Sequence, residues 1–181
     1  MRAPQRTRQR RRLSRRCRTR HDASAEEPSR ACDAVIMDVP GACPAEYQLV
    51  EGPPTLDQYL NLRMRAGLSP RRPDQALAAL DGGWAALHVV HQPTATTVGM
   101  ERLLGDGGWY FHILDMAVLP DHQRRGLGDT ILGALLTKIH DHAPAGAYVS
   151  LMADPPGRRL YERHGFAATA PQSIGMAQIL G

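Results

Sequence analysis

Residues 123–128 read Gln123-Arg124-Arg125-Gly126-Leu127-Gly128, and they stand between an apolar run at residues 113–119 and a helical pattern. Apolar side chains recur in that pattern at three- and four-residue spacing, as on one face of a helix: Leu127, Ile131, Leu132, Leu135, Leu136 and Ile139. The first N–H groups of a helix lack partners within it, and the helix dipole favours negative charge there. A strand, a glycine turn and a helix start therefore form a candidate anion site.

The composition of this turn leaves the helix start open. No Ser, Thr or Asn occupies the expected cap position, and Gly126 and Gly128 let a ligand approach the backbone closely. A strand-to-helix turn with packing glycines would give the same spacing, so the pattern alone leaves both interpretations open. No Walker-type lysine and no third glycine follow, which disfavours nucleoside triphosphate and dinucleotide sites.

Two motifs carry a family resemblance. The stretch from Met116-Ala117-Val118-Leu119-Pro120 through Gly128 resembles the acetyl-CoA-binding motif of the GNAT acetyltransferase superfamily, Q/R-x-x-G-x-G/A after a strand ending in A-V-x-P. Downstream, Leu160-Tyr161-Glu162-Arg163-His164-Gly165-Phe166 resembles the family segment L-Y-x-x-x-G-F. Arg102, Asp106 and Gly107-Gly108 resemble an R-x-x-G-D-G segment of a small bacterial branch. The resemblance covers roughly residues 47–179.

The resemblance implies a fold and a function. The expected fold is α/β, with a central, mostly antiparallel sheet that splays open and is flanked by helices. The expected activity is acetyl-CoA-dependent transfer of an acetyl group to a primary amine, directly in a ternary complex and without a metal. The alternative is a catalytically inactive acyl-CoA-binding sensor or interaction module. The acceptor, a small-molecule or peptide amine, is not identified by the sequence. Homodimers are common in the family.

The resemblance also implies the residues that hold the cofactor. Backbone groups of the strand end would pair with the pantetheine arm, and backbone N–H groups of the turn would bind the pyrophosphate. Asp129 departs from the family pattern, because a carboxylate suits the first helical turn but repels phosphate. The cofactor-binding prediction comprises Met116, Ala117, Val118, Gln123, Arg124, Arg125, Gly126, Leu127, Gly128, Asp129 and Thr130.

The catalytic prediction combines resemblance with acid–base chemistry. Tyr161 resembles the family's general acid, which protonates the leaving thiolate of CoA. The acceptor amine must lose a proton before it attacks, and Asp115, Glu101 and His112 are the candidate bases, with the two carboxylates preferred and acting through water. Side chains expected to line the acceptor pocket are Tyr59, Arg63, Arg102 and His112.

Length and composition bound these expectations. A chain of 181 residues predicts one domain, and no apolar run approaches the roughly 18 residues of a membrane span. Cys17, Cys32 and Cys43 all precede the predicted domain and lack metal-ligand spacing, which fits a reducing cytoplasm. Residues 1–45 hold eleven Arg and five acidic residues, so the remainder of this +4 chain has a charge of −2. Nucleic acid is therefore not an expected partner of the domain.

The uneven distribution of charge predicts a domain boundary, with an Arg-rich tail at 1–45 and a domain at 46–181. The tail is expected to be disordered, since it repels itself and has little to bury. It could be a nucleic-acid or anionic-surface arm, a transit peptide, or an inert or non-native extension with the true start at Met37.

The hydrophobic pattern predicts a mixed order of elements in the domain. Expected strands are residues 47–50, 84–91, 96–104, 109–119 and 147–152, with a closing pair at 166–170 and 174–178. Expected helices are residues 56–68 with Thr55 as N-cap, 73–80, the motif helix to about residue 140, and 156–164.

Overall fold

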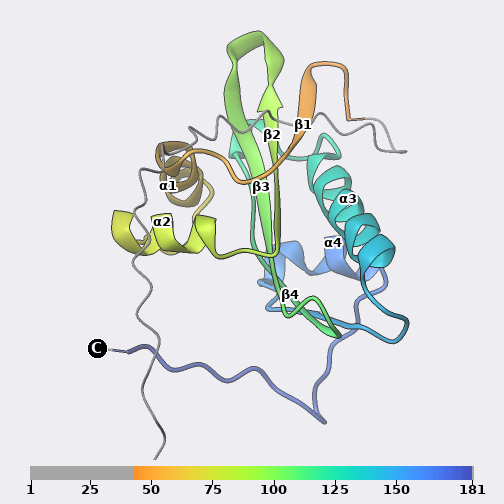
Figure 1. Cartoon of the computed structure of the whole chain (residues 1–181). Helices are drawn as coiled ribbons and strands as arrows, with labels where there is room; N and C mark the ends of the chain where they lie inside the picture. The colour runs from red at the N-terminus through yellow and green to blue at the C-terminus, as the bar shows by residue number, and fades with distance from the viewer. Residues whose placement is uncertain (1–42, 181) are drawn as a thin grey trace, which may run out of the picture. The chain divides into compact units, whose positions relative to one another are not determined.

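The computed structural model describes residues 43–180, which include the predicted boundary at 45–46, whereas residues 1–42 of the predicted Arg-rich tail lie outside the described residues. The described chain forms one five-stranded sheet with helices on both faces (Figure 1). The elements in chain order are β1 Tyr47–Glu51, α1 Leu56–Arg65, α2 Pro73–Asp81, β2 Ala85–His91, the 3-10 turn η1 Gln92–Thr94, β3 Thr96–Gly105, β4 Tyr110–Val118, η2 Pro120–His122, α3 Leu127–His142, β5 Tyr148–Leu151, η3 Pro155–Gly157 and α4 Arg158–Arg163.

The sheet is antiparallel from β1 to β4 and parallel only between β4 and β5. Strand order follows the chain throughout. Short reversals at η1 and at residues 106–109 join β2, β3 and β4, whereas α1 and α2 lie between β1 and β2. The α3 helix connects β4 to β5 and carries the chain back to start a parallel partner. This arrangement confirms the predicted α/β class and the mostly antiparallel sheet.

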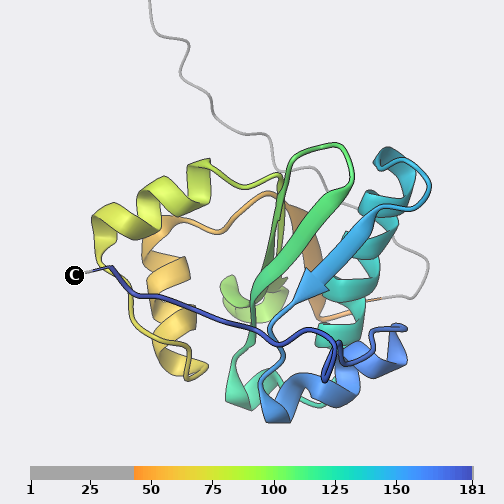
Figure 2. The same ribbon diagram turned by 90° about the horizontal axis from the view of Figure 1, so that it is seen from below.

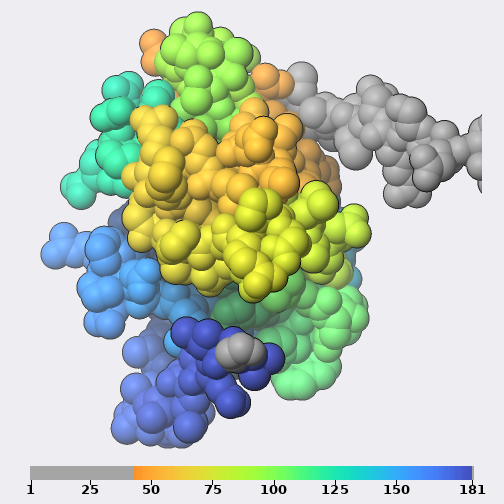
Figure 3. Space-filling view, turned by 90° about the vertical axis from the view of Figure 1, so that its left-hand side faces the viewer, coloured from red at the N-terminus to blue at the C-terminus, as the bar shows by residue number. Residues whose placement is uncertain are grey.

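The helices divide between the two faces of the sheet. Figure 2 shows α1 and α2 on one face and α3 and α4 on the other. Figure 3 looks onto α1 and α2, which pack against each other. Between sheet and helices lies a core of fully buried apolar side chains, the largest of which are Tyr59, Phe111, Leu62, Leu87, Met100, Leu103, Leu119, Leu127, Ile131, Leu132 and Leu135.

Local sequence signals explain where α1 begins. Thr55 is its N-cap, as predicted: the backbone N–H of Gln58 donates to Thr55 Oγ1 at 3.4 Å, and the Thr55 N–H donates to Gln58 Oε1 at 3.0 Å. The helix ends at Arg65 with Ala66 as C-cap and Gly67 at φ +78°, slightly before the predicted end.

The predicted closing pair of strands is wrong. Residues 166–180 contain no strand, and their large apolar side chains Ile174, Met176, Ile179 and Leu180 are exposed. Pro171 lacks an N–H donor and Gly175 weakens strand formation, so the short alternation there was a poor strand signal. Within residues 43–180, none of the helices combines the length and apolar character needed to cross a membrane.

Candidate functional site

The strands β4 and β5 separate at the predicted site. Residues Tyr110–Ile113 of β4 pair with Tyr148–Leu151 of β5, but β4 continues to Val118 without β5 beside it. The β4 backbone at residues 114–118 therefore has an edge that β5 does not cover, which is what strand-like pairing with an extended ligand requires.

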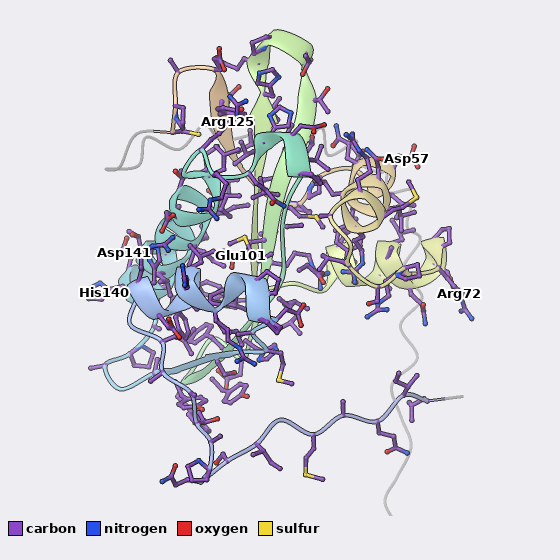
Figure 4. The ribbon with its side chains drawn as sticks, turned by 180° about the vertical axis from the view of Figure 1, so that it is seen from behind. Asp57, Arg72, Glu101, Arg125, His140 and Asp141 are labelled. Atoms are coloured by element: carbon purple, nitrogen blue, oxygen red, sulfur yellow. The ribbon has the colours of Figure 1, made fainter. Side chains whose placement is uncertain are left out.

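The helix start next to this edge is open, as predicted. Gly126 is the N-cap of α3 at φ +81°, and no side chain caps the helix. Arg124 also has a left-handed φ of +62°, which is uncommon for a residue other than glycine. Gln123 Nε2 donates to the Val118 carbonyl at 2.9 Å and ties the turn to the end of β4. Arg124 and Arg125 are exposed, and Figure 4 shows Arg125 beside the start of α3.

The charge of Asp129 is compensated by α4. Arg163 Nη2 lies 2.9 Å from each carboxylate oxygen of Asp129, and His164 Nε2 lies 3.3 Å from Oδ1. These partners neutralise the carboxylate that stood out from the family pattern, and they tie α4 to the first turn of α3. The predicted repulsion of phosphate by Asp129 is thereby reduced.

Tyr161 lies on α4 with its hydroxyl free of hydrogen bonds to the described residues. Its half-buried ring packs edge-on against Phe166, with ring centroids 6.1 Å apart. Burial, followed by the nearby carboxyl groups of Glu101 and Asp154, raises the pKa of Tyr161 to about 12. The phenol therefore keeps its proton throughout the physiological range.

Glu101 is a fully buried carboxyl group without a hydrogen-bond partner in the described part of the chain. Its exposed fraction is 0%, and neither Oε1 nor Oε2 is satisfied. Burial raises the pKa of Glu101 well above its ordinary value. Figure 4 shows Glu101 on the side of the sheet that faces α4, which places it on the same side as Tyr161.

Asp115 lies on the opposite side of the sheet, among three of the residues predicted with it. Tyr59 donates its hydroxyl to Asp115 Oδ2 at 2.6 Å, and Arg102 Nε donates to the same oxygen at 3.0 Å. Arg63 Nη1 donates to Oδ1. Both carboxylate oxygens are thus engaged by strong, mostly charge-assisted hydrogen bonds. The structure brings Tyr59, Arg63, Arg102 and Asp115 together but separates them from Glu101 and Tyr161.

His112 shares the face of Arg102. The register places His112 opposite Leu104 of β3, two residues from Arg102, and opposite Ser150 of β5. Its Nδ1 lies 2.9 Å from Ser150 Oγ, while Nε2 makes no hydrogen bond to the described residues. Burial lowers the pKa of His112 below its ordinary 6.5, so the imidazole is neutral at pH 7.

Sequence reasoning missed a cluster behind the turn. His122 directly precedes Gln123, and its Nδ1 lies 3.0 Å from the hydroxyl of Tyr47, 75 residues earlier in the chain. The His91 ring lies 4.9 Å from the His122 ring, and burial, His91 and Arg125 lower the pKa of His122. Only the proximity of His122 to the motif could have pointed to it.

Other possible sites are poorly supported. A hollow of about 230 Å³ at the far end of β1 and β2 contains no predicted site residue; its walls include Pro53, Trp84 and Lys138. No group of three or more His, Cys, Asp or Glu within residues 43–180 could hold a metal ion.

Comparison with known proteins gives a consistent match. A family model described as the acetyltransferase (GNAT) domain matches residues 73–176. A protein of unknown function from methicillin-resistant Staphylococcus aureus, described as a probable acetyltransferase, is 33% identical, with a TM-score of 0.71 over 74% of this chain and 99% of that one.

More distant structures show the same fold. A GNAT-family acetyltransferase from Streptococcus pneumoniae is 22% identical with a TM-score of 0.62, over 74% of this chain and 98% of that one. An acetyltransferase from Trypanosoma brucei is 24% identical with a TM-score of 0.57, over 74% and 99%. Among curated proteins, no sequence match is found.

Glu101→Gln tests the burial of this carboxyl. The folded state holds the acid protonated above the ordinary pKa of 4.5, whereas the unfolded chain ionises there. Wild-type stability therefore falls as the pH rises from that value towards the folded-state pKa, by at most about 1.4 kcal/mol per pH unit. Urea unfolding at about pH 5 and about pH 8 measures the free energy of unfolding of both proteins. The value for the variant, relative to that of the wild type, should be higher at about pH 8 than at about pH 5.

The same substitution at an exposed carboxylate is the control. Glu46→Gln should leave the stability difference from wild type the same at both pH values, because Glu46 is exposed. A pH-independent difference for Glu101→Gln as well would show that the Glu101 carboxyl is solvated.

Proposed function

Because the chain belongs to the GNAT acetyltransferase family, we propose that it transfers the acetyl group of acetyl-CoA to a primary amine, directly within a ternary complex. The family assignment supports acetyl transfer, and the geometry of the site is the support for direct transfer to an amine. The acceptor is a small-molecule or peptide amine. The alternative of an inactive acyl-CoA-binding module gains no support from the comparisons.

The observation that carries the proposal is the open start of α3 beside the uncovered edge of β4. Uncapped N–H groups after Gly126 suit the pyrophosphate of CoA, and the backbone at Met116–Val118 suits the pantetheine arm. Exposed Arg124 and Arg125 add positive charge at the same end. Acetyl-CoA itself supplies a thioester, whose carbonyl is open to attack and whose thiolate is the leaving group.

Tyr161 is the proposed general acid. A leaving thiolate must take up a proton, and a phenol whose pKa is about 12 carries one at any working pH. The hydroxyl is not committed to any described residue, so it is free to bond the sulfur. Burial raises the pKa of nearby Glu101 well above its ordinary value, which disfavours a negative charge beside the departing thiolate.

Among the three predicted bases, the surroundings favour His112. Asp115 has both oxygens bonded to cations and a phenol, and burial raises the pKa of Glu101, which disfavours the ionised form that accepts a proton. His112 is neutral at pH 7, is fixed through Nδ1 by Ser150, and has Nε2 available to accept a proton. The proposal therefore assigns proton removal to His112, directly or through one water molecule.

A covalent acetyl-enzyme is not part of the proposal. Residues 46–181 contain no cysteine, and the pKa of the half-buried Cys43 is raised by burial. A thiol with a raised pKa is a weak nucleophile at neutral pH, so direct attack by the amine is the simpler route.

Acetyl-CoA binding and turnover test the function. Acetyl-CoA at about 100 times its Kd should stabilise the folded protein by about 2.7 kcal/mol, seen as a rise in Tm. Release of CoA thiol in the presence of a panel of amines then reports turnover. Stabilisation without turnover by any amine would favour the inactive module, and no stabilisation would contradict both.

Tyr161→Phe tests the general acid. Removal of one hydroxyl should lower kcat by about 10²- to 10⁴-fold while the affinity for acetyl-CoA stays nearly constant, because the proton is needed only when the thiolate leaves. Steady-state kinetics and calorimetric titration with acetyl-CoA separate the two quantities. An unchanged kcat would remove Tyr161 from the mechanism.

The pH profile of kcat tests His112. The base works when neutral, so kcat should rise with pH through the lowered pKa of His112, with a midpoint below 6.5. His112→Asn should abolish this acidic limb, whereas Glu101→Gln should leave it in place. If the limb disappears in Glu101→Gln instead, the buried carboxyl is the base.

A further inference from the structure

The β4 strand contains a bulge at Asp115. Met100 of β3 pairs with Ala117 and Arg102 pairs with Leu114, so Glu101 faces two residues of β4, Asp115 and Met116. Asp115 has φ +60°, a left-handed conformation that few residues other than glycine adopt. The bulge begins two residues after Ile113, the last residue of β4 that pairs with β5. Bulges of this kind change the direction of a strand.

The side chain of Asp115 sits in a buried network, which we call the Asp115 clamp: Tyr59, Arg63, Arg102 and Asp115. Arg63 and Arg102 are each only 4% exposed, yet both point their guanidinium groups at one carboxylate. The guanidinium carbons also lie 5.4 Å and 5.8 Å from the centre of the Tyr59 ring. Removal of any one of these charged groups would leave the other buried charges without full compensation, which is strongly destabilising.

The clamp is anchored in three separate segments. Arg63 on α1 donates from Nε and Nη2 to the carbonyl of Ser69, at 3.0 Å and 2.8 Å. Arg102 on β3 donates from Nη1 to the carbonyl of Ala79 on α2. The Asp115 carboxylate is thus the point where α1, α2 and β3 all hold β4.

We propose that the Asp115 clamp fixes the β4 bulge and thereby sets the backbone of Met116–Val118 to receive the donor from the opposite side of the sheet. Asp115, Arg63 and Arg102 are then positioning residues, and they neither abstract a proton nor bind the acceptor. The donor-affinity part of this inference rests on the proposed function.

The Asp115→Asn variant distinguishes a positioning role of Asp115 from a role as general base. Asn tolerates the left-handed conformation, so the variant removes charge with little change of backbone preference. If Asp115 were a base, kcat would fall with unchanged affinity for acetyl-CoA. If Asp115 holds the bulge, the loss of its charge leaves both arginines without their anion, and β4 is no longer fixed at the bulge. Acetyl-CoA binding should then weaken by about tenfold or more.

The experiment compares wild type, Asp115→Asn, Arg102→Gln and the double variant by calorimetric titration with acetyl-CoA. Because one network acts as a unit, the double variant should bind nearly as well as the weaker single variant. Glu51→Gln, which removes the carboxylate partner of Lys138 far from the bulge, is the matched control and should bind like wild type. Tyr59→Phe removes two hydrogen bonds, one to Asp115 and one from Arg63, but no charge. It should therefore give a smaller loss, which keeps the test usable if Asp115→Asn does not fold.

Hydrogen exchange of the β4 amides gives a readout that needs no ligand. Asp115→Asn or Tyr59→Phe should speed exchange at residues 114–118, and Glu51→Gln should not. If wild type does not bind acetyl-CoA, the proposed function fails and exchange alone decides the clamp. Unchanged exchange in both clamp variants, or unchanged acetyl-CoA affinity with a reduced kcat, would overturn the clamp.

Discussion

Strand β4 pairs with β3 along most of its length but has β5 beside it only as far as Ile113, so its later backbone groups need another partner on that edge. Regular strands in a sheet satisfy their N–H and C=O groups through neighbours, and a strand that loses a neighbour midway must find water or a ligand. The turn at Gln123 and the open start of α3 follow directly from the end of this strand. The placement of every proposed donor contact depends on that separation.

The sheet also divides the chemistry of the site into two sides. On the side of α4, burial raises the pKa of both Glu101 and Tyr161 and so favours their protonated forms. On the side of α1, His112 is neutral and Asp115 is fully engaged by cations. In the proposed mechanism the amine nitrogen and the leaving sulfur are bonded to the same carbonyl carbon, so both groups must reach the reacting atoms where β4 and β5 separate.

Local signals made most of the fold predictable. The helical periodicity after Gly126, the Thr55 cap and the reversal at residues 106–108 each depend on neighbours in sequence, and all three appear in the structure. The closing strands failed because Pro171 and Gly175 weaken a pattern that a sheet edge would have had to support.

The site was less predictable because its contacts join distant segments. The residues Tyr59, Arg63, Arg102 and Asp115 could each be singled out, yet their mutual contacts depend on α1 lying over β3 and β4. Likewise, the pairing of Asp129 with Arg163 joins residues 34 apart, and no spacing rule reveals it.

The hydrogen bond between Tyr47 and His122 connects the first strand of the sheet to the turn before α3. Tyr47 opens β1, the strand farthest from β5 in the sheet order, but its hydroxyl holds the residue that precedes Gln123. The shape of the turn is therefore partly encoded some 75 positions upstream of it. An engineer who varies only the glycine-rich segment would leave one of its supports untouched. One who trims the first strand would change the proposed cofactor site without touching its motif.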